Sequence, residues 1–164
     1  MAFQCNKSED DSGMTDSGGM IDVSGKDVTV RIAKARGAIR LSHEAFDALR
    51  KGICPKGDVL ATARIAAIQA VKSTPTTIPM CHPIAIEGVE VTFDLDQSVF
   101  CVTATVVVRS CGKTGVEMEA LCGVAAACLT VYDMLKYTGQ DMTIERIELV
   151  EKSGGRSGHY KRSD

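Results

Sequence analysis

The chain has 164 residues, of which 45% are apolar and 4% aromatic, and its formal net charge is −2. This length fits one domain with its own hydrophobic core. The nearly balanced charge excludes a global basic field for nucleic acid, so a bound anion would need a local cluster of cations.

Residues 1–19 are polar and acidic, and they lack the basic start and the apolar run of a signal peptide. Their Ser, Asp and Gly content predicts a disordered tail. No stretch stands out as long enough to span a membrane. We therefore expect a cytoplasmic protein that binds neither nucleic acid nor a membrane.

A first strand is predicted where Val28, Val30 and Ile32 alternate with Thr29 and Arg31, and it continues less regularly over the following residues.

Two helices are predicted next. Ser42 is placed to cap a short helix through Arg50, and Asp58 starts a clearer helix that runs to about Lys72. Arg64 projects from the apolar face of the second helix, so it needs a partner. That partner is either an internal carboxylate or a bound anion.

Prolines punctuate the segment 73–83, which we predict to be a loop. Alternating apolar residues then predict two antiparallel strands, 89–95 and 100–108, joined by a turn at 96–98.

A long helix is predicted from about Val116 to Thr138, followed by a final strand over residues 142–150. Asp133 lies at the edge of the apolar stripe of this helix, and Lys136 lies in its middle. The stripe is formed by Met118, Leu121, Cys122, Ala125, Leu129 and Tyr132.

This order of elements predicts an α+β fold, a ferredoxin-like βαββαβ sandwich with an antiparallel sheet and one additional N-terminal helix. The single catalytic domain would span residues 20–158, followed by a flexible tail at 159–164. Because both helices cover one sheet face, we expect the other face to be bare and apolar, which favours a homo-oligomer.

Several classes of site are disfavoured. The chain has no P-loop, no G-x-G-x-x-G and no H-E-x-x-H motif. Its seven cysteines form no C-x-x-C pair, so we predict free thiols and no metal site.

Polar clusters lie at the predicted element boundaries. Lys56 and Asp58 open a helix, where they either hold phosphate or form a solvated turn with an N-cap. Cys81 and His82 lie in the proline-bounded loop, where His82 either transfers protons or is structural.

Two further clusters follow. Lys113 precedes Glu117 and Glu119 at a helix start, where carboxylates also suit the helix dipole. Lys152 and Arg156 flank a glycine-rich segment that is either a closing loop or a solvated tail.

Asp133 and Lys136 are neighbours at i,i+3, and they form either a structural ion pair or an acid/base pair. Glu119 lies fourteen residues before Asp133, so a straight helix would separate them by about 21 Å. If both act in one reaction, either the helix is not straight or two subunits share the site. We predict a shared site.

In this order, the clusters resemble the cyclic pyranopterin monophosphate synthase family, protein C of molybdenum cofactor biosynthesis. The resemblance covers Met20 to Gly158. The matching segments are Met20–Ser24, Lys56–Val59 with Ala61–Ala66, Ile78–Pro83, Gly112–Leu121, Leu129–Met134 with Lys136, and Lys152–Gly155.

The resemblance implies a lyase that converts 3′,8-cyclo-7,8-dihydro-GTP to cyclic pyranopterin monophosphate and releases pyrophosphate. It implies a ferredoxin-like fold assembled as a hexamer of three dimers, with the site at a dimer interface. The sequence requires no cofactor, although Mg²⁺ is a candidate companion of the triphosphate or pyrophosphate.

Roles follow from the resemblance position by position. Asp133 and Lys136 are the implied acid/base pair, with His82 and Lys56 as further catalytic candidates. The implied substrate-binding residues are Cys81, His82, Glu117, Met118, Glu119, Lys72, Lys113, Lys152, Arg64 and Arg156.

Two departures from the family pattern are visible, since Arg156 stands where the family often has Lys and Leu135 where it often has Cys. An alternative function is a non-catalytic phosphate-ligand-binding protein on the same scaffold, and a second is a purely structural oligomer. A binder has no need of the Asp133–Lys136 pair, and a structural oligomer has no need of so many cations at loop edges.

Overall fold

The computed structural model describes residues 19–163. Apart from Gly19, the tail predicted at residues 1–19 lies outside this part of the chain, as does Cys5. In chain order the elements are β1 (Thr29–Arg40), α1 (His43–Lys51), α2 (Val59–Thr77), β2 (Gly88–Asp96), β3 (Cys101–Gly112), α3 (Glu117–Leu135), the 3-10 helix η1 (Lys136–Thr138), β4 (Thr143–Ser153) and β5 (Tyr160–Lys161).

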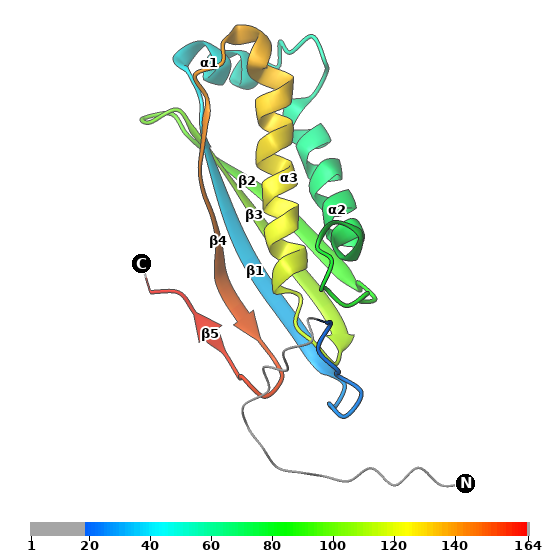
Figure 1. The fold of residues 1–164 in the computed structure, drawn as a ribbon. Helices are drawn as coiled ribbons and strands as arrows, with labels where there is room; N and C mark the ends of the chain where they lie inside the picture. Colours follow the sequence, from blue (N-terminus) through cyan, green and yellow to red (C-terminus); the bar gives the residue numbers. More distant parts are fainter. Residues whose placement is uncertain (1–18, 164) are drawn as a thin grey trace, which may run out of the picture.

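The strands form one five-stranded antiparallel sheet in the order β2-β3-β1-β4-β5. Helices α2 and α3 pack side by side on one face of this sheet, and α1 lies at one end of the molecule (Figure 1). Without α1 and β5 the order is βαββαβ, which confirms the predicted α+β, ferredoxin-like arrangement.

The helix starts follow from their capping residues. The Ser42 hydroxyl accepts a hydrogen bond from the Ala45 amide at 3.1 Å, and the Asp58 carboxylate accepts one from the Ala61 amide at 2.9 Å. Gly52 ends α1 with φ 64°, a conformation that costs glycine little. These residues confirm the predicted starts of α1 and α2.

Helix α2 is longer than predicted, because it includes residues 73–77 of the expected loop. Pro75 lies within its last turns, where its missing amide removes a single helical hydrogen bond. The buried Thr74 holds this turn, since its hydroxyl donates to the Ala70 carbonyl at 3.0 Å and its own carbonyl accepts from Ile78 at 2.8 Å.

Helix α3 buries a different face from the predicted one. Leu129 of the predicted stripe is 60% exposed, whereas Gly123 and Val124 are buried. Because α3 is apolar on nearly all sides, periodicity did not identify its inner face. The inner face is the one with small side chains, because these let α3 approach α2 and the sheet closely. The buried residues include Ala120, Gly123, Val124, Ala127, Cys128 and Val131.

We expect Gly123→Leu to destabilise the fold. A Cβ at Gly123 would lie 3.0 Å from Val71 and 3.1 Å from Val106, so a larger side chain overpacks the contact between α3, α2 and β3. The expected loss of unfolding free energy is about 1–3 kcal/mol, measured by urea denaturation. Gly25→Leu is the control because nothing lies within 4 Å of Gly25. Equal stability of the two variants would contradict this packing.

The uncovered face of the sheet exists, but it is not the bare apolar surface that we expected. Its centre carries an ion pair between Arg36 of β1 and Glu148 of β4, with Nη2 and Oε1 2.7 Å apart. Arg146 and Arg162 also approach Glu148. The polar centre of this face therefore gives no support for oligomerisation. Exposed apolar side chains lie on the helices, at Ile65 and Leu129, and at the start of β1, at Val30.

The C-terminal residues differ from the predicted flexible tail at 159–164. Tyr160 and Lys161 pair with β4, the Arg162 amide donates to the Val150 carbonyl at 2.8 Å, and His159 Nε2 lies 2.7 Å from Glu151 Oε1. A strand of two residues has no hydrophobic period to detect, so the sequence could not predict it.

One segment of the described chain, Glu117–Thr138, is long and apolar enough to cross a membrane by composition, which the sequence analysis did not anticipate. Half of its most apolar stretch is buried within the protein, where α3 packs on α2, β1 and β3. This is the behaviour of a core helix.

Candidate active site

An ion triad lies where α3 ends and before α2 begins. Asp133 Oδ2 lies 2.6 Å from Lys56 Nζ, and Asp133 Oδ1 lies 2.8 Å from Lys136 Nζ. Lys56 also donates to the backbone carbonyl of Asp133 at 3.0 Å. The structure thus confirms that Asp133 and Lys136 are neighbours, and it adds Lys56 to them.

The electrostatics of this triad differ from the prediction. Lys136 begins η1 rather than lying in an apolar stripe, and its side chain is 54% exposed. The hydrogen bond from Lys136, then that from Lys56, lowers the pKa of Asp133 to about 2. The same hydrogen bond to Asp133 raises the pKa of Lys136. In the isolated chain the triad is therefore a carboxylate that orients two ammonium donors.

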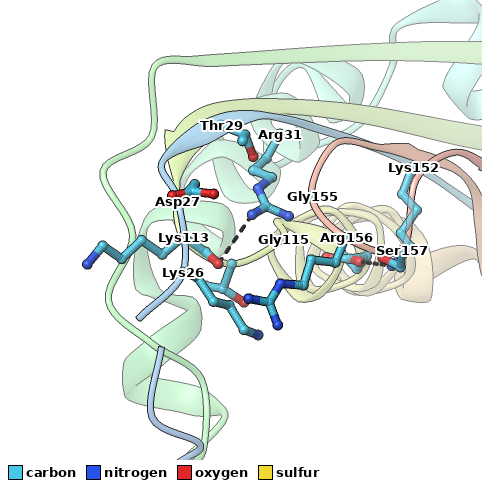
Figure 2. A pocket seen from close by; sticks show the side chains of 12 residues that line it. Lys26, Asp27, Thr29, Arg31, Lys113, Gly115, Lys152, Gly155, Arg156 and Ser157 are labelled. Atoms are coloured by element: carbon cyan, nitrogen blue, oxygen red, sulfur yellow. Dashed lines mark hydrogen bonds and ion pairs between the residues drawn. The ribbon is translucent and has the colours of Figure 1, made fainter. Parts of the chain in front are cut away.

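A cationic pocket with a volume of about 530 Å³ lies at the opposite end of α3. Such a volume is typical of small-molecule sites. Lys152 reaches it from the end of β4, Arg156 from the segment after β4, Arg31 from β1, and Lys113 from the loop before α3 (Figure 2). Its lining residues are Lys26, Asp27, Thr29, Arg31, Lys113, Thr114, Gly115, Glu117, Lys152, Gly155, Arg156 and Ser157.

Arg31 is the cation that sequence reasoning missed. It is only 8% exposed, and it donates Nε to the Gly112 carbonyl at 3.2 Å and Nη2 to the Lys113 carbonyl at 3.3 Å. No carboxylate of the described chain pairs with it. A buried guanidinium without a counter-ion favours an anionic ligand beside it.

The position of Arg31 follows from the phase of β1. Val30 is 63% exposed, whereas Arg31, Ala33 and Ala35 face the helices. The apolar residues Val30 and Ile32 of the predicted alternation therefore lie on the strand face that points away from the helices. The small residues Ala33, Ala35 and Gly37 carried the correct signal, because only small side chains fit beneath α3.

Glycines leave the room that this pocket needs. A Cβ at Gly155 would overlap the Arg31 guanidinium, and one at Gly115 would overlap the Glu117 carboxylate. Gly155 also has φ 77°, in the left-handed region that side chains avoid. The glycine-rich segment therefore packs directly on Arg31.

Glu117 and Lys152 form an ion pair inside the pocket. Lys152 Nζ lies 2.9 Å from Glu117 Oε1 and 3.0 Å from the Ser157 hydroxyl, and both side chains of the ion pair are 26% exposed. Lys113 donates to the Ser24 carbonyl at 2.7 Å. The structure thus brings together the predicted residues Glu117, Lys152 and Lys113.

A second hollow of about 270 Å³, the carboxylate hollow, adjoins the pocket and shares Thr114, Gly115 and Glu117 with it. Its other lining residues are Met80, Cys81, His82, Ile84, Met118 and Glu119. His82 Nε2 lies 2.8 Å from the Ile21 carbonyl. The predicted residues Cys81, His82, Glu117, Met118 and Glu119 therefore meet in one place.

Glu119 is the least exposed group of this hollow, at 2%. Burial, with a smaller contribution from the charge of Glu117, raises the pKa of Glu119. Burial and then the charge of Glu119 also raise the pKa of the Cys81 thiol. A carboxyl group of this kind can hydrogen-bond a polar ring or hold a proton for transfer.

Two predicted residues do not join these clusters. Arg64 donates to the Val91 carbonyl at 3.4 Å and lies 5.8 Å from the centroid of the Phe93 ring. The first partner considered for Arg64, an internal carboxylate, does not contact it among the described residues. Lys72 is exposed on α2 and lines neither hollow.

The triad and the two hollows lie at opposite ends of α3. This helix runs without a break from Glu117 to Leu135 (Figure 1), so the separation of about 21 Å between Glu119 and Asp133 stands. A bend of the helix, the first of the two explanations considered, is absent from this part of the chain.

Two features of the described chain bear on metals and thiols. The described residues contain no group of three or more His, Cys, Asp or Glu side chains placed to hold a metal ion. The six described cysteines are free thiols.

Comparison with known proteins gives a consistent family. The MoaC family model matches residues 20–155. The chain is 51% identical over 152 residues to a cyclic pyranopterin monophosphate synthase of Novosphingobium aromaticivorans, covering 91% of this chain and 96% of that protein. It is 49% identical over 145 residues to the synthase of Thermomicrobium roseum, covering 88% and 87%. The matched span contains the triad, the carboxylate hollow and all lining residues of the cationic pocket except Arg156 and Ser157, and the chain belongs to the MoaC family.

Proposed function

We propose that this protein is a lyase of molybdenum cofactor biosynthesis that converts 3′,8-cyclo-7,8-dihydro-GTP to cyclic pyranopterin monophosphate and pyrophosphate. The observation that carries the proposal is the adjacency of a cationic pocket, with buried Arg31, to a hollow that contains buried Glu119. A triphosphate attached to a polar ring system needs both environments side by side. The relatives described above carry the name of this synthase.

The cationic pocket is the proposed triphosphate subsite. Arg31, Lys113, Lys152, Lys26 and Arg156 line it, and guanidinium and ammonium groups are strong donors to phosphate oxygens. A ribose hydroxyl oxygen bonds to the α-phosphorus, and the bond from that phosphorus to the oxygen bridging to the β-phosphate breaks. The cations stabilise the charge that accumulates on the departing pyrophosphate.

The carboxylate hollow is the proposed subsite for the purine-derived ring. It offers the hydrogen-bonding groups of Glu119, Glu117 and His82 beside the apolar surfaces of Met118 and Met80. A ring system that is opened and rebuilt through proton transfers needs such groups at fixed positions.

The triad supplies the principal acid and base in this proposal. Because Asp133 and its two lysines lie far from Glu119 along α3, we propose that they act on substrate held by the pocket of a neighbouring subunit. Covering the triad with that subunit would remove water from it, and this desolvation opposes the rise that Asp133 causes in the pKa of Lys136. The exposed apolar side chains Ile65 and Leu129 on α2 and α3 support such a contact.

The proposed assembly is a hexamer of three dimers in the cytoplasm, with each site at a dimer interface. Lys72 and Arg64 remain proposed phosphate contacts only through this assembly, since neither lines the pocket of its own chain. The chain's own residues supply the acids, bases and cations of the reaction, and Mg²⁺ is proposed only as a companion of the triphosphate or pyrophosphate.

Incubation with enzymatically made 3′,8-cyclo-7,8-dihydro-GTP tests the function directly. We expect equal amounts of pyrophosphate and cyclic pyranopterin monophosphate, measured by phosphate release and by chromatography of the pterin. Tight binding of the substrate without turnover would instead favour a non-catalytic phosphate-ligand-binding protein.

A further inference from the structure

Glu117 is the one carboxylate shared by the cationic pocket and the carboxylate hollow. Its side chain folds over Gly115, where a Cβ would overlap it, and its Oε1 lies 2.9 Å from Lys152 Nζ. The Glu117 carboxylate thus occupies, in the free chain, a position from which it neutralises a cation of the pocket.

An incoming polyphosphate competes for the same ammonium group. It carries several negative charges, and Arg31, Lys113 and Arg156 also draw it toward Lys152. Lys152 has a flexible stem and rotatable donors, so it can exchange one acceptor for another. Once Lys152 binds phosphate instead, Glu117 loses its ion-pair partner among the described residues.

The loss of this partner affects the carboxylate hollow because no lysine or arginine lines that hollow. The titratable groups around Glu119 are Glu117 on the same helix, Cys81 and His82 across the hollow, and Cys122, whose charge acts on Cys81. His82 is the only one of them that can carry a positive charge. The negative charge of an unpaired Glu117 carboxylate therefore acts on Glu119, and few positive charges nearby offset it.

We propose that Glu117 couples the two subsites: phosphate binding takes Lys152 from Glu117, and the unpaired Glu117 carboxylate then holds a proton on Glu119. The inference rests on the proposed function and deepens it, because it gives Glu117 a positioning role between triphosphate binding and ring chemistry. The reaction would gain an acid in the ring subsite only when the triphosphate is bound. The charge that Glu117 already places on Glu119 has the required direction, since it raises the pKa of Glu119.

The test uses inorganic tripolyphosphate and carbon-13 NMR of the glutamate side-chain carboxyl groups, with the Glu119 signal assigned by its loss in Glu119→Gln. We expect saturating tripolyphosphate to raise the proton affinity of Glu119 in the wild-type protein by roughly threefold to tenfold. Glu117→Gln should abolish this response while tripolyphosphate still binds, as checked by calorimetry.

Two lysine variants separate unpairing from loss of charge. Lys152→Met should raise the proton affinity of Glu119 without tripolyphosphate, because it leaves Glu117 unpaired. Lys113→Met removes an equal charge from the same pocket but leaves the Glu117–Lys152 pair intact, so the Glu119 titration should stay close to that of the wild type.

Three results would overturn the coupling. The first is a Glu119 titration that does not move in a wild-type protein that binds tripolyphosphate and turns over substrate, which would leave the proposed function intact. The second is an undiminished response in Glu117→Gln, which would mean that the phosphate charge acts directly. The third is a failure to bind tripolyphosphate, which would overturn both the coupling and the proposed phosphate subsite.

Discussion

Replacing Lys136 by Met is expected to lower kcat by about 10²–10⁴, the range typical of a lost general acid or base. Asp133 would keep Lys56 at 2.6 Å, so the variant should fold and bind substrate while losing one of the two oriented ammonium donors. Steady-state kinetics with 3′,8-cyclo-7,8-dihydro-GTP measure the change.

The matched control for this variant is Lys51→Met. Lys51 also pairs with an aspartate close to it in sequence, since its Nζ lies 3.1 Å from Asp47 Oδ2, but it lies on α1 outside the site. We expect its kcat to equal that of the wild type. A Lys136→Met protein that keeps nearly full activity would show that the triad is a structural ion pair.

Replacing Arg31 by Lys is expected to raise KM about tenfold or more while lowering kcat less. The lysine keeps the positive charge. It lacks the planar guanidinium, which can bind the Gly112 and Lys113 carbonyls and still present further donors to the pocket. Hydrogen bonds to charged groups contribute about 1.5–3 kcal/mol each, and 1.4 kcal/mol corresponds to a factor of ten.

Arg109→Lys is the control for Arg31→Lys. Arg109 lies on the neighbouring strand β3 and is exposed, and it lines neither hollow. Because Arg31 is buried, the thermal stability of both variants must be measured beside the kinetics. A stable Arg31→Lys protein with the KM of the wild type would remove Arg31 from the triphosphate subsite.

The sequence predicted the elements of the fold better than the faces that they bury. N-cap residues such as Ser42 and Asp58 bond to backbone amides only three residues away, so short motifs were enough to predict the helix starts. The inner face of α3 depends on how closely Gly123 approaches Val71 and Val106 across the sequence. That close approach is a tertiary property, and an almost uniformly apolar helix carries no period that would reveal it.

The candidate site was predictable where its residues stand together in short motifs. Glu117, Met118 and Glu119 follow one another, and Cys81 adjoins His82, so these five residues of the carboxylate hollow were identified. The other lining residues, Met80, Ile84, Thr114 and Gly115, were not predicted as site residues. Arg31 was missed because it stands alone in an alternating strand and belongs to no short polar motif. Lys26 and Thr29 also line the pocket and were not predicted as site residues.

We propose that each working site combines the triad of one subunit with the hollows of another. Two individually inactive variants, Glu119→Ala and Asp133→Ala, can be mixed and allowed to exchange subunits, with exchange verified by native mass spectrometry. In a two-fold symmetric dimer, a mixed pair contains one site with both residues intact, so random exchange should restore about a quarter of the wild-type activity. Mixed dimers that form and remain as inactive as their parents would contradict the shared site.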